Sequence, residues 1–336
     1  MVNAQPVSNL NSMPVRRRNI GFFKYIFKNW VLFVMMLPLL VAMFFNNYLP
    51  MAGSLLAFKD YKAYSNSFVH NYIVSKWVGL QNFEFLWKTT DAFEFTRNTI
   101  VYNLVFIFLG LIVSVAVAIA LNEVRNAKLS RAYQTIMFLP YFLSWVIVSY
   151  LVFAFLSEDM GFMNKVLLPA LGINYDPSSG CSDVAWYSKA EYWPFILTFC
   201  QLWKYTGYNS VVYLAAIAGI DTEFYEAARI DGASKWQQIR KITLPMLYPL
   251  MTIMTLLAVG KIFNSDFGLF FQVPRNSGIL YSTTRTIDTY VYTALTSMGD
   301  MGMAAATSFY QSVVGFVCVM ASNLFVRKID PEKALF

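Results

Sequence analysis

The chain has 336 residues, of which 57% are hydrophobic and 13% are charged, and its mean hydropathy is +0.47. This composition is too apolar for an ordinary soluble domain and is typical of an all-α membrane protein with several spans. The net charge of +7 does not gather into a basic patch, which argues against nucleic acid as a partner. The single histidine, His70, supports neither a metal site nor a catalytic triad.

The apolar segments define the expected organisation of the chain. Residues 1–28 are predicted to form a polar cytoplasmic tail, and no removable signal peptide is expected, because the first apolar run lacks a clear small-residue cleavage site. Six segments are long enough to cross a bilayer as helices. They lie at residues 30–50, 97–122, 133–156, 193–220, 247–271 and 302–325. The membrane domain would then cover residues 29–325, with a second cytoplasmic tail at residues 326–336.

The distribution of lysine and arginine predicts the orientation. If the N-terminus lies inside, the cytoplasmic segments carry fifteen of these residues and the outer loops carry eight. The inner segments are also shorter in sum, so the bias holds in density as well as in number. Because positive residues are enriched in cytoplasmic loops, both termini are expected in the cytoplasm. The segment at residues 221–245 would lie there too.

Charged side chains are predicted deep inside the fourth and fifth spans, where they are costly and usually face a protein interior or a water-filled path. Aromatic faces can stack on sugar rings, while amide and ammonium groups bind hydroxyls or carboxylates. One interpretation is a solute pathway, mildly positive and suited to an anionic or polyhydroxy solute. Its candidate residues are Trp203, Lys204, Tyr205, Tyr208, Asn209, Lys261, Asn264 and Asp266. The other interpretation is that these side chains pair internally or reach the interface and only hold the bundle together.

The segment between the fourth and fifth spans is charged and has the pattern of a helical hairpin. Asp221 can cap a short first helix. Gly232 would end that helix, because the chain reversal needs a left-handed residue. Ser234 and Gln237 then fit a capping box that opens a second short helix, which is expected to end just before Pro245.

The spacing within this hairpin resembles the EAA loop of binding-protein-dependent ABC importer permeases. That loop has Glu-Ala-Ala, a glycine four residues after the second alanine, and an Ile-x-Leu-Pro ending. The matching residues here are Glu226, Ala227, Ala228, Gly232, Ile242, Leu244 and Pro245. Further stretches, such as residues 77–83 and 121–126, resemble the carbohydrate branch of these permeases. The similarity is closest to permeases for oligosaccharides and polysaccharides, including polyuronides such as alginate.

The resemblance implies a type I importer with six membrane helices and cytoplasmic coupling helices in the bacterial cytoplasmic membrane. Two related permease subunits would form the pore, an ATPase dimer would bind ATP and Mg²⁺, and an external solute-binding protein would deliver the solute. The residues that would contact the ATPase are Glu226, Ala227, Ala228, Asp231, Gly232, Leu244 and Pro245. The chain contains no G-x-x-x-x-G-K-[ST] phosphate loop, so it is expected to be non-catalytic and to hold no cofactor of its own.

Two other functions stay open at this point. An ion-gradient-driven carrier could use Lys204, Lys261 and Asp266 as an ion relay, although it would not need the hairpin and no internal repeat is visible. A membrane-embedded enzyme would be expected to carry paired carboxylates or a histidine cluster, and the outer pair Glu158 and Asp159 has no histidine nearby. Solute uptake that requires a separate ATPase would distinguish the importer from both.

Overall fold

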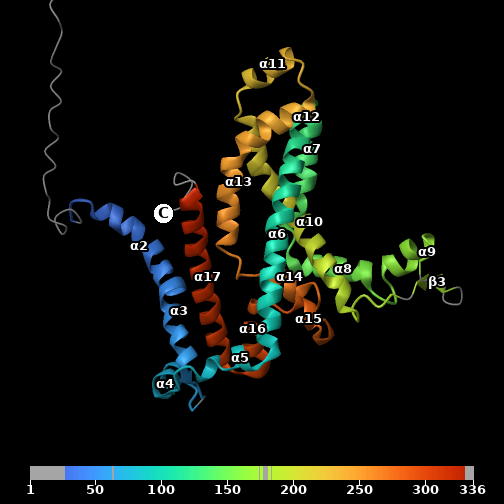
Figure 1. The fold of residues 1–336 in the computed structure, drawn as a ribbon. Helices are drawn as coiled ribbons and strands as arrows, with labels where there is room; N and C mark the ends of the chain where they lie inside the picture. Colours follow the sequence, from blue (N-terminus) through green and yellow to red (C-terminus); the bar gives the residue numbers. More distant parts are fainter. Residues whose placement is uncertain (1–26, 63, 174, 177–180, 183, 330–336) are drawn as a thin grey trace, which may run out of the picture. The chain divides into compact units, whose positions relative to one another are not determined.

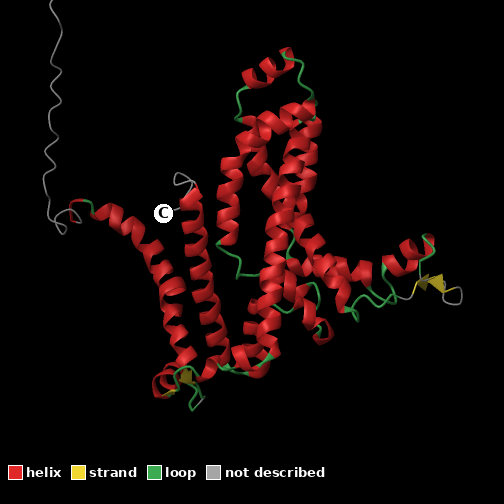
Figure 2. Cartoon of the chain, viewed as in Figure 1, coloured by secondary structure: helices red, strands yellow, loops and turns green. Residues whose placement is uncertain are grey.

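The structure, a computed structural model, describes residues 27–62, 64–173, 175–176, 181–182 and 184–329. Most of the two predicted tails lies outside these ranges. Regular structure is almost entirely helical, and the strands of the described part form two short antiparallel pairs (Figure 2). The strand pairs are β1 Lys59–Asp60 with β2 Lys76–Trp77, and β3 Tyr175–Asp176 with β4 Cys181–Ser182.

The predicted class, a helical membrane protein, is confirmed. Four helices of the described part are long and apolar enough to cross a membrane, or five if one sharply bent pair counts as a single span. The helix α10, Trp193–Ala218, is outside this set although its 26 residues would extend about 39 Å, enough for a bilayer. Polar residues such as Gln201 and Lys204 make it less apolar than the others.

The chain divides into two compact units, residues 1–53 and 54–336. The first contains α2 Trp30–Met43, a π-helical turn at Phe44–Tyr48 and α3 Leu49–Met51, which follow one another without a break. Every residue of α2 is exposed and the helix is apolar on all sides, as expected for a span that contacts lipid or another subunit.

The second unit is a helical bundle (Figure 1). Its long helices are α6 Thr90–Asn122, α10, α13 Leu244–Val259 and α17 Met301–Ile329. Val115 and Ala118 of α6 pack against Tyr213 and Ile217 of α10 and Leu247 of α13. In Figure 1, α11 and α12 lie at one end of this bundle, and α5 and α16 lie toward the opposite end of α6. The shorter helices are α4 Phe68–Val74, α5 Phe85–Lys88, α9 Leu168–Ala170, α11 Thr222–Ile230, α12 Lys235–Gln238, α14 Phe267–Gln272, α15 Tyr281–Thr284 and α16 Ile287–Thr293.

The prediction of one continuous helix at residues 133–156 is wrong. The structure has α7 Ala127–Phe138, a 3₁₀ turn at Leu139–Phe142 and α8 Trp145–Leu156, and the chain bends by 98° between them. Pro140 favours the tighter turn because it lacks an N–H. The Ser144 hydroxyl then accepts a hydrogen bond from the Ile147 N–H and starts α8 as a new helix.

The prediction of a continuous helix at residues 247–271 is also wrong. Helix α13 ends at Val259, and a turn at residues 260–266 precedes α14. The Asp266 carboxylate caps α14 by accepting hydrogen bonds from the N–H groups of Gly268 and Leu269, at 3.0 and 3.4 Å. A carboxylate N-cap is a helix start signal that lay unnoticed inside an apolar run.

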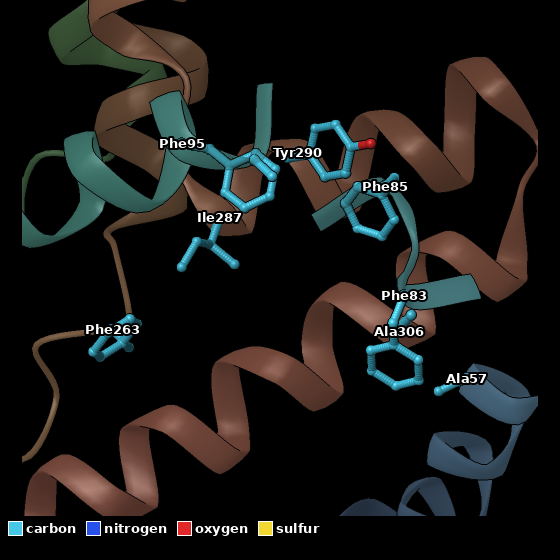
Figure 3. Packing of buried hydrophobic residues seen from close by; sticks show 9 residues of the cluster. Ala57, Phe83, Phe85, Phe95, Phe263, Ile287, Tyr290 and Ala306 are labelled. Carbon is cyan, nitrogen blue, oxygen red and sulfur yellow. The ribbon is translucent and has the colours of Figure 1, made fainter. Parts of the chain in front are cut away.

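Aromatic packing closes the end of the bundle that is distant from α11 and α12. Tyr290 of α16 lies between Phe95 of α6 and Phe85 of α5, with ring centroids 4.7 and 5.7 Å away (Figure 3). Phe95 and Ile287 are fully buried in the same cluster. This cluster holds α5 and α16 against the start of α6.

Gly207 allows α10 to approach the end of α7, which leads to the first prediction. A Cβ at this position would lie 1.9 Å from the Met137 carbonyl oxygen. We therefore expect Gly207→Ala to force the two helices apart and to lower the free energy of unfolding by about 1–3 kcal/mol, as overpacking does. Thermal unfolding in detergent measures the change.

The matched control is Gly315→Ala in α17, where the nearest atom to a new Cβ is 3.9 Å away. Both substitutions gain the same helix propensity. Equal thermal stability of the two variants would contradict the close approach of α10 and α7.

Candidate transport pathway and cytoplasmic helix pair

The predicted hairpin has the expected local structure in its first half. The Asp221 carboxylate accepts a hydrogen bond from the Glu223 N–H at 3.0 Å and starts α11. At the other end, the Gly232 N–H donates to the Arg229 carbonyl and the Ala233 N–H to the Ala228 carbonyl, at 3.1 and 2.8 Å. This is a Schellman motif, with Gly232 in the left-handed conformation at φ +73°. The predicted cap and the predicted helix-ending glycine are confirmed.

The second half is confirmed at its start and different at its end. Ser234 and Gln237 form a reciprocal capping box at the start of α12. The expected helix end before Pro245 is wrong, because α12 continues through a π-helical turn at Ile239–Thr243 into α13. Pro245 offers no N–H, and the preceding Leu244 N–H reaches back five residues to the Ile239 carbonyl. The wider turn accommodates the proline without ending the helix.

Two side-chain contacts attach the helix pair to the bundle. The hydroxyls of Tyr225 and Thr243 are hydrogen-bonded at 2.9 Å, and the Lys235 ammonium lies 2.7 Å from the Glu123 carboxylate at the end of α6. Away from these contacts, three large apolar side chains face outward: Phe224 at 51% exposure, Trp236 at 69% and Ile230 at 87%. These side chains are therefore available for contact with another protein.

The predicted coupling residues occupy two places. Glu226, Ala227 and Ala228 lie on α11, and Asp231 and Gly232 end it. Leu244 and Pro245 instead belong to the start of α13, where Leu244 packs against the bundle core. The structure thus groups the first five residues on one exposed helix and separates the last two from them.

A cavity of about 570 Å³ lies between α6, α10, α13 and the turn at residues 260–266. Five of the eight predicted pathway residues line it: Tyr205, Asn209, Lys261, Asn264 and Asp266. Its size is that of a ligand-binding pocket. Trp203, Lys204 and Tyr208 are not among the residues that line it.

Sequence reasoning missed several polar residues of the cavity wall. Gln201 and Tyr213 extend the Tyr205–Asn209 stripe along α10 at a spacing of four, and Asn103 and Ser114 contribute from α6. Residues four apart lie on one face of a helix. This periodicity was available in the sequence, but Lys204 and Tyr208 have the same spacing, so it did not show which of the two stripes faces the cavity.

Lys204 is buried against backbone. Its ammonium donates to the carbonyl oxygens of Pro140, Tyr141 and Leu143, with the first two at 3.4 and 3.0 Å. The same group lies 5.2 Å from the Trp145 ring centroid. These carbonyls lie in the segment between α7 and α8, so the Lys204 ammonium hydrogen-bonds to the backbone where the third predicted span is broken.

Trp203 and Tyr208 lie on other parts of the α10 surface. Trp203 is 39% exposed, and Tyr208 stacks on Tyr141 with ring centroids 4.4 Å apart. The stacking joins Tyr208 to the turn after α7.

Asp266 joins the two broken spans. Its carboxylate accepts hydrogen bonds from the Trp145 indole N–H at 2.8 Å and from the Tyr205 hydroxyl at 2.9 Å, in addition to capping α14. Gly268 is packed so closely here that a Cβ would lie 2.2 Å from Trp145 Cδ1. The carboxylate is therefore fully engaged by donors.

The backbone of the turn at residues 260–266 is also satisfied by side chains from neighbouring helices. The Asn103 amide donates to the Ile262 and Asn264 carbonyls at 3.0 and 3.1 Å. The Gln311 amide donates to the Phe263 carbonyl at 2.7 Å. Non-helical backbone at membrane depth requires such partners.

Lys261 differs from Lys204, since its side chain is exposed at the cavity. Within the described ranges, no hydrogen bond or ion pair engages its ammonium. Two wall atoms, Ser114 Oγ and Gln201 Oε1, are also buried there without a partner. The exposed ammonium of Lys261 is therefore the group of the cavity wall that suits a polar, electron-rich solute.

The helical spans, the cavity between them and the exposed helix pair together define a membrane transport component. Residues 107–331 match the family described as binding-protein-dependent transport system inner membrane component. The chain therefore belongs to this family of ABC transporter permeases. It is a non-catalytic, multi-pass inner-membrane subunit, and a partner ATPase handles ATP.

Curated relatives match along most of the chain. Protein LplB of Bacillus subtilis (strain 168) is 31% identical over 301 residues, covering 90% of each chain. The polygalacturonan/rhamnogalacturonan transport system permease protein YteP of the same strain is 30% identical over 305 residues, covering 90% of this chain and 89% of YteP.

A solved structure shows the same fold. It is the crystal structure of a bacterial ABC transporter involved in the import of the acidic polysaccharide alginate. One of its chains aligns with a TM-score of 0.80 and 30% identity, covering 92% of this chain and 99% of that chain. The permease fold predicted from the resemblance is confirmed.

The Trp145–Asp266 contact yields the second prediction. Trp145→Phe would keep a smaller aromatic ring at this position but remove the indole donor, leaving one carboxylate oxygen of Asp266 short of a partner. Because hydrogen bonds to charged groups contribute about 1.5–3 kcal/mol, we expect a loss of stability in this range. The matched control is Trp203→Phe on the exposed surface of α10, for which a change below about 0.5 kcal/mol is expected. Equal thermal unfolding temperatures of both variants would show that the hydrogen bond between Trp145 and Asp266 does not stabilise the fold.

Proposed function

We propose that this chain forms half of the translocation path of an ATP-driven importer for oligosaccharides or polysaccharides. The observation that carries this proposal is the polar cavity with its unpaired Lys261. Its amides, hydroxyls and aromatic edges match the hydroxyl-rich surface of a sugar, and an ammonium without a partner favours a solute that bears carboxylates. We therefore favour an acidic saccharide such as a polyuronide.

The relatives support this substrate class. YteP is a permease for polygalacturonan and rhamnogalacturonan, and a transporter of similar fold imports alginate. A second solved structure, with a TM-score of 0.79 and 30% identity over 92% of this chain and 98% of its own, is an alginate ABC transporter in complex with an alginate-pentasaccharide-bound periplasmic protein. Delivery by an external solute-binding protein is accordingly part of the proposal.

The proposed membrane domain, residues 29–325, has six spans. The bent pair α7–α8 would count as one, and α10 would be the additional span, because it lies within the bundle and is long enough. Both termini would be cytoplasmic, in keeping with the distribution of lysine and arginine. The second half of the pore would come from a related permease subunit.

The helix pair α11–α12 would dock into the ATPase dimer. Phe224, Ile230 and Trp236 offer the apolar contact, and Glu226, Ala227 and Ala228 lie on the same short helix. Because α12 is continuous with α13, movement of the docked pair would be transmitted directly to a helix that lines the cavity. Rigid-body movement of this kind could alternate access to the path.

The ion-relay alternative finds less support. Lys204 and Asp266, two of its three candidate residues, are engaged by backbone carbonyls and by fixed hydrogen-bond donors respectively. A relay requires groups that can exchange protons or ions with a path. Lys261 is the remaining candidate, and a single residue does not form a relay.

The proposal is tested by co-expression of this chain with the ATPase and the second permease of its transport system, followed by reconstitution with the solute-binding protein. ATP-dependent uptake of an alginate pentasaccharide is the expected result. Uptake that follows an ion gradient without ATP would support the carrier instead.

The third prediction concerns Gly232, whose left-handed conformation a β-branched residue cannot readily adopt. No atom lies within 4 Å of a new Cβ, so the effect of substitution is confined to the backbone. We expect Gly232→Val to cost about 1–2 kcal/mol locally, to misdirect α12 and to abolish ATPase co-purification. Gly232→Asn, which tolerates this conformation, should retain it. If the ATPase co-purifies equally with both variants, the helix pair is not its docking site.

The fourth prediction concerns Lys261. In Lys261→Gln, uptake of an acidic oligosaccharide should fall about tenfold, corresponding to one charge-assisted hydrogen bond of roughly 1.4 kcal/mol, while uptake of a neutral oligosaccharide changes little. Lys165→Gln, an exposed lysine outside the cavity, is the control for net charge. Equal loss for acidic and neutral solutes would make Lys261 a structural residue.

A further inference from the structure

The turn between α14 and α15 carries two successive non-glycine residues in the left-handed conformation. Arg275 has φ +57° and Asn276 has φ +48°. Asparagine tolerates this conformation, but an arginine rarely adopts it, because its Cβ crowds the following carbonyl. Backbone strain of this kind persists only where the surroundings hold it, and it is concentrated at functional sites.

The hydrogen bonds of the turn define the position that Arg275 occupies. Its N–H donates to the Gln272 carbonyl at 3.1 Å, and the Asn276 N–H donates to the Phe271 carbonyl at 3.0 Å. These are the two bonds of a Schellman motif, in which Arg275 stands at the place usually taken by glycine. The corresponding residue at the end of α11 is Gly232. An arginine is therefore present where backbone geometry alone favours glycine.

Neighbouring segments hold this strained turn. The Ser149 hydroxyl of α8 donates to the Gln272 carbonyl at 2.7 Å, and the Tyr187 hydroxyl donates to the Val273 carbonyl at 3.4 Å. Val273 is fully buried. Burial raises the pKa of Tyr187 to about 12, so its phenol keeps the proton that it donates. The backbone that carries Arg275 is thus rigid.

The Arg275 side chain itself is exposed. Its guanidinium carbon lies 4.2 Å from the ring centroid of Phe153 in α8. Among the residues that the structure describes, no carboxylate forms an ion pair with it. An aromatic ring that supports one face of a guanidinium orients the group and leaves N–H donors free for a carboxylate.

We propose that Arg275 is an anchor for an acidic side chain of the external solute-binding protein. This inference rests on the proposed function, which supplies that partner and places the turn on the outer side. Arg275 does not line the cavity, and Figure 1 shows α15, next to the turn, toward the end of α6 that is away from α11. Rigid arginines are enriched at the centres of protein interfaces.

A protein partner fits the turn better than the saccharide does. A saccharide site brings several free polar groups together. Here the Asn276 amide oxygen already accepts a hydrogen bond from the Tyr281 hydroxyl at 3.0 Å, so the guanidinium and the amide N–H groups of Asn276 offer donors only, which suits a carboxylate.

The test uses Arg275→Gly in the complete transporter, reconstituted in lipid nanodiscs. Glycine relieves the left-handed strain, so the variant should unfold at the same temperature as the parent or a higher one. The readout is ATPase stimulation by the solute-binding protein loaded with alginate pentasaccharide. We expect the binding-protein concentration for half-maximal stimulation to rise about tenfold, as for a truncated interface anchor, with basal and saturating rates unchanged. For Arg275→Lys we expect an intermediate half-maximal concentration, and for Lys165→Gln the same half-maximal concentration as for the parent.

The possible outcomes separate the alternatives. Half-maximal stimulation of Arg275→Gly at the parent's concentration would overturn the inference. A weaker response to free pentasaccharide, with unaltered response to the binding protein, would assign Arg275 to the saccharide and overturn it as well. Loss of the second permease on purification would assign Arg275 to the subunit interface. A parent transporter that hydrolyses ATP but ignores every loaded binding protein would remove the proposed delivery step together with this inference.

Discussion

The hydrogen bond from Trp145 to Asp266 is the contact on which the rest of the bundle depends. Two of its helical segments are interrupted, and interrupted backbone at membrane depth must find partners within the protein. Asp266 caps α14, the helix after the second interruption. Its carboxylate also accepts a hydrogen bond from Trp145, the first residue of α8, which follows the first interruption. The Lys204 ammonium donates hydrogen bonds to backbone carbonyls in the interruption between α7 and α8. The two breaks are thereby held against α10 as one assembly.

This assembly determines the chemistry of the cavity beside it. Lys204 and Asp266 are held by fixed hydrogen-bond partners, whereas Lys261 presents an exposed ammonium at the cavity. The remaining wall combines amides, hydroxyls and aromatic edges with aliphatic side chains such as Ile107 and Leu111. Such a wall is compatible with the hydroxylated, anionic solute that we propose. The continuous helix from α12 to α13 then connects the cavity wall to the surface where an ATPase would dock.

The sequence predicted local structure well and long-range structure less well. The caps at Asp221 and Ser234 and the reversal at Gly232 depend on side-chain and backbone bonds within five residues, so spacing alone was enough to find them. The breaks near Pro140 and Asp266 were missed because both lie inside apolar runs whose composition satisfies a continuous span. At Pro245 the error was the opposite one: a helix end was predicted, but a π-helical turn accommodates the proline and the helix continues.

The sequence by itself determined the family, the membrane class and the presence of a capped helix pair, because these follow from hydropathy, motif spacing and neighbouring residues. It also identified the charged residues of α10 and the following segment without separating their roles. Only the tertiary structure distinguished Lys204, held by carbonyls from another helix, from Lys261, which stays free at the cavity. The physical reason is that the cost of a charge in a membrane depends on its partners, and those partners come from segments more than fifty residues away in the chain.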